Sequence, residues 1–332
     1  FNLARGSFNC FGCGIGGKLL VSDKLRMDLN LPKEKSQPNR KTRELIIPEK
    51  HHQVMSLAQE ILQSRFNGSL AKSYLIRRGL NPDIAFSLGA GSSDDFLISA
   101  LMDSGLSLDD LIFYGFVGLS EKLTSYSGLS PLLRRRGLKE KDIQRKITSL
   151  KLQKKSKQGG ETILAYPFLM LDRRVTFPLT LAGKITNFYG RAVYEVDKRF
   201  RHRKLSVAET NVPQGGFNIE ALTAKSRELI MTESVIDALS LIELGRADKE
   251  SVVGIIGTTN YLIIDVLAGS GKEIQIALND DEGGRKATLK VAEYVKNRYP
   301  AAVVKDFTKN FVSLYPEMAG LDYNEFLKKT KK

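Results

Sequence analysis

The sequence predicts an α/β protein in which a basic region of mixed α+β structure precedes a parallel-sheet α/β domain. The length of 332 residues suits about two domains. Lysine and arginine number 51 against 37 acidic residues, and the whole excess of +14 falls within residues 131–204. From residue 227 onward, strand-like apolar runs alternate with helical patterns, which is typical of a parallel sheet with helical crossovers.

Composition excludes several classes of protein. Apolar residues make up 42% of the chain, which is too much for a disordered protein. No apolar run approaches the roughly 18 residues of a membrane span, and the N-terminus lacks a signal-peptide pattern, so we expect no membrane partner and a cytoplasmic location. The two cysteines, Cys10 and Cys13, are too few for a disulfide framework and indicate a reducing compartment.

The N-terminal half reads as a linker followed by short helices. Residues 30–48 hold three prolines and mixed charge, as linkers do. Apolar residues then recur at i, i+3 and i+4, and Ser69 and Ser107 are suitable N-caps. The predicted helices cover about 49–66, 69–78, a short stretch from Asn81-Pro82, 94–104 and 107–113. We expect His51 and His52 to be exposed on the first of these helices.

The basic block comes next and indicates a polyanion partner, most often nucleic acid. Residues 131–158 read as helical, and strands over 174–180 and 184–193 predict an antiparallel hairpin. Phe188 and Tyr189 either stack on bases or pack the hairpin, and we favour packing. The alternative for the block is a solvated basic face or a disordered tail. The cations that either contact the polyanion or solvate a loop are Arg134, Arg135, Arg136, Lys154 and Lys155.

The C-terminal half predicts strands and helices in strict alternation. The strands cover 228–232, 252–256, 273–278 and 302–306, and the helices between them 234–244, 260–268 and 283–298. In sheets of this kind the ligand site lies beyond the carboxyl ends of the strands. The residues that directly follow the strands are therefore the candidates for chemistry.

Carboxylates gather at these strand ends. Glu233 follows the first strand, and Asp237 lies four residues later on the same helix face. Asn279, Asp280 and Asp281 follow the third strand. Carboxylates this close cannot all ionise without a cation, and oxygen ligands favour Mg²⁺, which supports phosphoryl chemistry. The alternative is ordinary acidic helix N-termini, but the repetition at successive strand ends favours a metal site.

Motifs in this half resemble a known family. TESVID (232–237), GTT (257–259) and NDDEGGRKA (279–287) resemble the TOPRIM domain of bacterial-type primases and topoisomerases, which implies a site for Mg²⁺ or Mn²⁺. The one departure is Asn279, where the family has Asp, although an amide oxygen can still ligate a cation with less charge. LDYNEFLKK (321–329) is similar to the late acidic motif of the family. The resemblance implies Glu233 as the general acid/base or metal-site carboxylate and, as Mg²⁺ ligands, Asp237, Asn279, Asp280, Asp281 and Asp322.

Segments upstream favour primase over topoisomerase. AKSYLIRRGLNPDIAFSLGAG (71–91), RVTFPLTLAGKITNFYGRAV (174–193) and RKLSVAET (203–210) resemble the polymerase domain of bacterial-type, DnaG-like primases, in the family's order. The resemblance implies a DNA-directed RNA polymerase, a nucleotidyltransferase that makes short RNA primers on single-stranded DNA from NTPs. A replicative helicase is a further implied partner. The implied nucleic-acid or NTP contacts are Arg174, Arg191, Lys204 and Arg285.

SFNCFGCGIGG (7–17) carries a Cys-x-x-Cys pair, which has the right spacing for two zinc ligands. It resembles the second half of the primase zinc ribbon, in which an upstream Cys-x-x-His supplies the other two ligands. The resemblance implies that Cys10 and Cys13 bind Zn²⁺ in the complete protein. Because residue 1 is Phe rather than Met, we expect the chain to be a fragment that lacks the first half of the ribbon.

These expectations divide the chain into five parts. They are a partial zinc ribbon (1–29), a linker (30–48), a basic N-terminal subdomain of the primase core (49–220), a TOPRIM domain (221–310) and a C-terminal helical segment (311–332). One alternative is a non-catalytic single-stranded DNA-binding protein with a degenerate TOPRIM domain, which Asn279 favours. Another is a TOPRIM nuclease or topoisomerase. We expect a nucleoid-associated protein, encoded by a chromosome or by a plasmid, phage or other mobile element.

Overall fold

The structure of the protein is a computed structural model. It describes residues 47–94, 96–120, 166–208 and 212–331, the backbone of segments 7–9, 16–21, 42–45, 153–155 and 162–164, and the single residues 139 and 141. Cys10, Cys13 and Arg134 to Arg136 lie outside the described residues. The predicted helix over 131–158 is wrong at its end, because β6 (Gln153–Lys155) pairs antiparallel with β7 (Thr162–Leu164). Pairing with a neighbouring strand overrides the helix preference of lysine and glutamine here.

An antiparallel sheet forms the centre of the N-terminal subdomain. The predicted hairpin is confirmed as β9 (Arg174–Leu181) and β10 (Lys184–Ala192). The sheet order is β11-β10-β9-β4, where β4 is Gly91–Ser93 and β11 is His202–Lys204, preceded by the short helix α9 (Lys198–Arg201). Phe188 and Tyr189 are buried, which agrees with the packing role expected for them.

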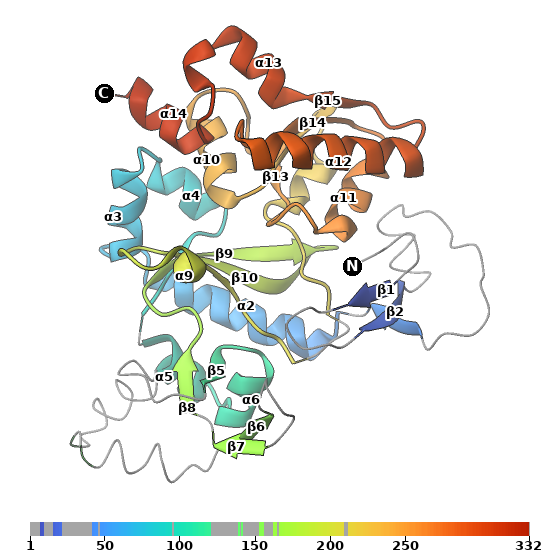
Figure 1. Ribbon diagram of the computed structural model, residues 1–332. Coiled ribbons are helices and arrows are strands. Elements are labelled where there is room, and N and C mark those ends of the chain that lie inside the picture. Colours follow the sequence, from blue (N-terminus) through green and yellow to red (C-terminus); the bar gives the residue numbers. More distant parts are fainter. Residues whose placement is uncertain are drawn as a thin grey trace.

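Short helices surround this sheet, as the N-cap signals predict. They are α2 (Glu49–Ser64), α3 (Leu70–Arg77), α4 (Pro82–Ser87), α5 (Phe96–Asp103) and α6 (Leu108–Phe113). A two-stranded sheet of β5 (Val117–Ser120) and β8 (Tyr166–Leu169) lies beside α5 and α6 (Figure 1). Within the described residues, no helix has the length and apolar character needed to cross a bilayer.

The expectation that His51 and His52 are exposed is wrong for His51, which is only 2% exposed, and His52 is half-buried. The register of β9 and β10 shifts between Ile185 and Asn187, which removes two backbone groups from the ladder. The Ile185 N–H donates to His52 Nδ1 at 3.1 Å, and His51 Nε2 lies 2.8 Å from the Thr186 carbonyl oxygen. The two histidines therefore provide hydrogen-bond partners for backbone groups that the β-bulge leaves without a partner in the sheet.

The C-terminal half forms the predicted parallel sheet. Its order is β13-β12-β14-β15, with β12 at Glu228–Thr232, β13 at Val252–Gly254, β14 at Glu273–Ala277 and β15 at Val304–Asp306. Leu229 and Met231 of β12 face α11 (Tyr261–Ala268) and α12 (Glu282–Arg298). Ile230 faces the opposite way, toward α10 (Val235–Glu243), α13 (Phe307–Leu314) and α14 (Tyr323–Thr330). The sheet is thus covered on both faces, as parallel sheets require. The remaining short helices are η2 (Ile219–Thr223) and η3 (Pro316–Met318).

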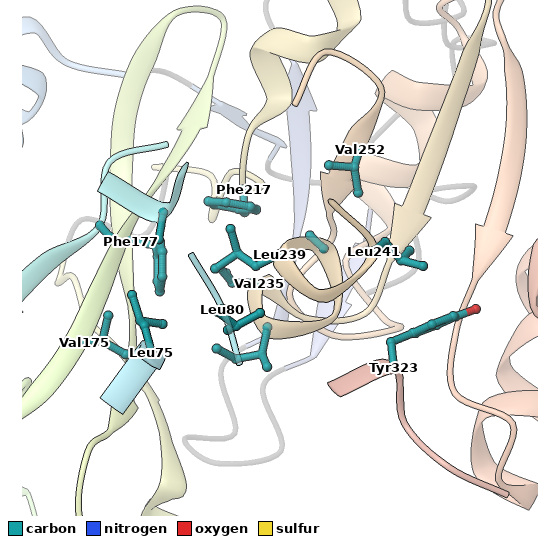
Figure 2. Close-up of a cluster of buried hydrophobic side chains, with 14 of the residues drawn as sticks. Leu75, Leu80, Val175, Phe177, Phe217, Val235, Leu239, Leu241, Val252 and Tyr323 are labelled. Carbon is teal, nitrogen blue, oxygen red and sulfur yellow. The ribbon is translucent and has the colours of Figure 1, made fainter. Parts of the chain in front are cut away.

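One apolar core joins the two halves of the chain. Figure 2 shows Val175 and Phe177 of β9 facing Val235 and Leu239 of α10, with Phe217 between the two groups. Phe217 also exchanges two backbone hydrogen bonds with Gly254 of β13, at 2.8 and 3.1 Å. The neighbouring Gly216 pairs in the same way with Thr180 of β9, so side-chain packing and backbone pairing both hold the hairpin at the edge of the parallel sheet.

The turn from β14 into α12 is closely packed. A Cβ atom at Gly284 would overlap the backbone carbonyl of Asn279, whereas one at Gly283 would meet only the Asp281 carboxylate at 3.4 Å. Only a residue without a side chain lets α12 begin this close to the end of β14. The second glycine of the Gly-Gly-Arg motif is thus a structural requirement of the turn.

We expect Gly284→Ala to lower the free energy of unfolding by about 2–3 kcal/mol, because the new methyl group must push α12 away from β14. Gly283→Ala is the matched control, with a near-neutral or slightly stabilising effect, since alanine favours helices. Urea unfolding followed by circular dichroism measures both variants. Equal stability of the two would contradict the packing described here.

Candidate functional site

A cavity of about 420 Å³ lies where the hairpin meets the carboxyl edge of the parallel sheet. Its acidic and polar lining residues, called the acidic wall below, come from the strand ends of the sheet and from the start of α14. Its cations, called the basic wall, come from the hairpin, β11, α9 and the end of α3. Its lining residues are Arg78, Tyr189, Arg191, Arg201, His202, Arg203, Lys204, Glu233, Ser234, Ile236, Asp237, Ile256, Gly257, Asn279 and Asp322. The structure thus brings together Glu233, Asp237, Asn279 and Asp322 with Arg191 and Lys204.

The acidic wall is built from helix starts. Glu233 directly follows β12, and Ser234 is the N-cap of α10. The Ser234 hydroxyl accepts the Asp237 N–H at 3.3 Å and donates to Asp237 Oδ2 at 2.7 Å, which fixes the carboxyl group in the first turn. Asp322 caps α14 by accepting the Glu325 N–H at 2.7 Å. Capping therefore determines where two of the three carboxyl groups point.

Burial and neighbouring negative charge raise the pKa of two carboxyl groups in the acidic wall. Asp237 is 6% exposed, and burial raises its pKa to about 7, with Asp322 and Glu233 adding to the increase. Burial also raises the pKa of Glu233, and Asp281 adds to that increase, so Asp281 lies close to the cavity although it does not line it. Groups of this kind favour protonation or a bound cation.

Of the three residues Asn279, Asp280 and Asp281 near the end of β14, only Asn279 lines the cavity. Asn279 Oδ1 is buried and has no hydrogen-bond partner among the described residues, which is costly for an acceptor unless a ligand satisfies it. Asp281 is exposed and caps α12 by accepting the Gly284 N–H at 2.6 Å.

Asp280 and Arg285 do not reach the cavity. Asp280 Oδ2 accepts the Gly320 N–H at 3.0 Å, and Oδ1 forms an ion pair with Arg285 at 3.2 Å. The Asp280 carboxylate thus links the start of α12 to the turn before α14. The resemblance had implied that Asp280 is a Mg²⁺ ligand and that Arg285 contacts nucleic acid or NTP. In the structure neither residue lies with the other candidates in the cavity.

The basic wall is fixed mainly by uncharged partners. Arg191 Nε donates to Tyr74 Oη at 3.2 Å, and Arg191 Nη1 also contacts the His202 ring. Lys204 Nζ donates to Gln214 Oε1 at 2.6 Å, and burial lowers the pKa of Lys204. Neither Tyr74 nor Gln214 is charged, so these contacts do not pair the two cations with an anion.

Arg174 is placed differently from the other expected contacts. It is 3% exposed, and its guanidinium donates to the carbonyls of Phe200 at 2.6 Å, Arg201 at 3.0 Å and Gly190 at 3.3 Å. It does not line this cavity. Arg174 therefore positions α9 and the start of β11 against the hairpin, rather than offering its charged Nη groups to this site.

Several lining residues had no signal in the sequence. Arg78 ends α3 in an ordinary helix-Gly turn, yet its Nη1 donates to Asn324 Oδ1 at 2.8 Å and brings α3 to α14. His202 lies 2.6 Å from Tyr189 Oη across the β10–β11 pairing. Arg78 and His202 reach the cavity only through tertiary contacts, and the spacing of residues along the sequence does not predict such contacts.

The donors of the acidic wall suit a hard cation. No three His, Cys, Asp or Glu side chains of the described ranges form a ready-made metal centre. The cavity offers the carboxyl groups of Glu233, Asp237 and Asp322 and the unsatisfied amide oxygen of Asn279. Mg²⁺ usually keeps several waters and binds one or two carboxylates together with substrate phosphates, so this all-oxygen set fits it.

Comparison with known proteins identifies the C-terminal half. Residues 230–327 match the Toprim-like family. No curated protein matched the chain.

Solved primase structures align with most of the chain. The zinc-binding and RNA polymerase domains of the Aquifex aeolicus primase align with a TM-score of 0.56 at 18% identity, covering 98% of this chain and 70% of that one. A primase domain from Pseudomonas aeruginosa gives 0.49 at 19% identity, covering 84% and 74% of the two chains. The E. coli primase catalytic core gives 0.49 at 16% identity, covering 84% and 83%. The Aquifex likeness shows a shared fold, so the predicted TOPRIM domain and primase-like architecture are confirmed.

The raised pKa of Asp237 predicts a pH-dependent stability. The folded state keeps a proton that the unfolded chain, with an Asp pKa near about 3.9, has released. The wild type should therefore lose on the order of 2–3 kcal/mol of unfolding free energy between about pH 5 and about pH 8 in a chelating buffer. Asp237→Asn should remove most of this loss, while the exposed control Asp248→Asn should keep it. Parallel urea titrations across pH provide the measurement, and identical profiles for the two variants would refute the assignment.

Proposed function

We propose that the chain is a DNA primase, which makes short RNA primers on single-stranded DNA from NTPs. The observation that carries the proposal is that Arg191 and Lys204 line the same cavity as Glu233, Asp237 and Asn279. Primer synthesis needs cations for a triphosphate and a template backbone, and carboxylates for a metal ion, within one site. The fold shared with the Aquifex aeolicus primase supports the same reading.

In the proposed reaction the protein mainly positions charge. Arg191 and Lys204 would bind the triphosphate of the incoming nucleotide, which phosphoryl transfer requires near the reacting phosphorus. Glu233, whose raised pKa suits proton transfer, would take the proton of the attacking 3′-hydroxyl as the new O–P bond forms and pyrophosphate leaves. Asp237, Asn279 and Asp322, with Asp281 beside them, would hold Mg²⁺ or Mn²⁺, which when bound neutralises the phosphate charge.

The template would approach along the remaining cations. Arg78, Arg201 and Arg203 line the same cavity, and Phe200 beside them is 46% exposed. Cations bind backbone phosphates without regard to sequence, as a primase template requires. The zinc pair Cys10 and Cys13 and a helicase partner remain predictions from the resemblance.

We expect Glu233→Gln to reduce primer synthesis by about 100-fold or more, because the amide can neither take the proton nor supply a charge. Glu228→Gln, an exposed change at the opposite end of the same strand, should leave the rate unchanged. The assay is Mg²⁺-dependent incorporation of labelled ribonucleotides on single-stranded DNA without a primer. Wild-type synthesis by Glu233→Gln would refute the site.

Asn279 separates the primase from a non-catalytic DNA-binding protein. Asn279→Asp adds a negative charge worth up to about 4 kcal/mol beside a bound cation before desolvation, so an active primase should need less Mg²⁺ for half-maximal synthesis. Asn297→Asp, an exposed change near the far end of α12, should leave the Mg²⁺ requirement as it is. If neither the wild type nor Asn279→Asp makes primers while both bind single-stranded DNA with a steep salt dependence, the binding protein is the correct function.

A further inference from the structure

A second cavity, of about 300 Å³, shares no lining residue with the first. It lies between the end of α2, the start of α3 and the pairing of β4 with β9. The lining residues that the following argument uses are Arg65, Ser69, Ser93, Asp94, Arg173 and Arg174.

The cavity carries an excess of positive charge. Arg65, Arg173 and Arg174 line it, and Asp94 is the only acidic residue among its lining residues. Arg65 Nη2 lies 3.5 Å from Asp94 Oδ2, and the Arg65 side chain is 47% exposed, so it remains accessible to a second anion. Arg173 also pairs with Asp172, which lies outside the lining, at 3.4 Å. With both carboxylates counted, the three arginines still leave a net positive charge, which favours an anionic ligand.

The start of α3 adds to this field. Ser69 caps the eight-residue helix by accepting the Lys72 N–H at 3.2 Å, and Ser69 and Leu70 both line the cavity. The N–H groups of a first helical turn have no partners within the helix, and the helix dipole places partial positive charge there. Phosphates commonly bind at such ends.

Two lining residues of the cavity carry buried donors that have no acceptor among the described residues. Ser93 is 1% exposed and Arg174 is 3% exposed, and neither Ser93 Oγ nor Arg174 Nε has a hydrogen-bond partner in the described part of the chain. The two residues are cross-strand partners in the β4–β9 pairing and both line the cavity. An arginine Nε–H can only donate, so the missing partner is an acceptor.

The backbone places these donors tightly. A Cβ atom at Gly91 would lie 2.7 Å from Leu62 Cβ, so β4 can rest against α2 only because this residue is glycine. That contact brings Ser93 beneath the end of α2, where Arg65 follows as the C-cap. The arrangement is fixed by the fold and does not depend on a flexible loop.

We infer that this second cavity binds a phosphate group carried by a nucleic acid strand or by a nucleotide. Ser93 Oγ and Arg174 Nε would donate to its oxygens from below, Arg65 would pair with its charge, and the start of α3 would face its open side. Since no residue is shared with the proposed polymerase site, binding here does not require primer synthesis.

Thermal unfolding of the whole chain in rising inorganic phosphate tests the inference. Ser93→Ala removes one hydrogen bond to the ligand and should weaken phosphate binding about three- to tenfold, while Arg65→Gln should weaken it about five- to tenfold. Without phosphate, Ser93→Ala should be as stable as the wild type or more so, because an unsatisfied hydroxyl is removed. Arg227→Gln is exposed and outside both cavities, so this charge-matched control should bind phosphate as the wild type does.

Lys204→Gln reports phosphate bound in the first cavity instead. If phosphate stabilises Ser93→Ala and Arg65→Gln as much as the wild type, or if only Lys204→Gln loses the effect, the inference is overturned. An absence of any phosphate effect on the wild type overturns it as well. A failure of primer synthesis would bear on the proposed function and not on this result.

Oligothymidylate with and without a 5′-phosphate then identifies the source of the phosphate. Weaker binding of both oligonucleotides by Ser93→Ala and Arg65→Gln supports a backbone phosphodiester. Weaker binding of only the phosphorylated one supports a terminal phosphate, as on a nucleotide. Equal binding of both oligonucleotides by all variants contradicts the site.

Discussion

The apolar core shared by β9, α3 and α10 is the constraint on which the rest of the structure depends. It brings a basic hairpin and the acidic ends of a parallel sheet to one cavity without a salt bridge between the described residues of the two walls. Arg191 is held by Tyr74 and Lys204 by Gln214, and no ion pair within the described residues joins either cation to Glu233, Asp237 or Asp322. Because packing supplies the association energy, both signs of charge stay available to a ligand. If salt bridges held the two walls together, the charges that a ligand needs would already be paired with each other.

The acidic wall is built from residues at helix N-termini, where polar side chains cap the first turn. Ser234 and Asp322, which line the cavity, are the N-caps of α10 and α14, and Asp237 lies in the first turn of α10. Each carboxyl group among them lies in the favourable field of a helix N-terminus, which offsets part of the cost of bringing negative charges together. One such helix start is unremarkable in any α/β protein. A site arises because parallel strands deliver several helix starts to one edge, and because Asn279 there keeps an acceptor that the described residues leave unsatisfied.

Much of this arrangement could be predicted from the sequence, and the exceptions share a cause. Alternating strands and helices follow from periodicity and caps, and strand ends in a parallel sheet must meet, so Glu233, Asp237 and Asn279 could be grouped correctly. Spacing does not say where a side chain points after a strand ends, and Asp280 turns instead to Gly320 and Arg285. The sequence pattern also does not predict burial by distant segments. Arg174 is covered by α9 and β11, and His51 is buried against the β-bulge of the hairpin. Arg78 and His202 enter the first cavity for the same tertiary reasons.

The closure of the first cavity by α14 has a consequence for how the protein is made. Asn324 is 1% exposed and bonds to both Arg78 and Ser240, and the pair with Arg78 joins positions 246 residues apart. Contacts of such long sequence separation form late, because the intervening chain must be ordered first. On a translating ribosome the hairpin and the first strands of the sheet emerge well before Asp322 and Asn324. The nascent chain therefore presents its positive wall to the surroundings before Asp322 completes the negative wall.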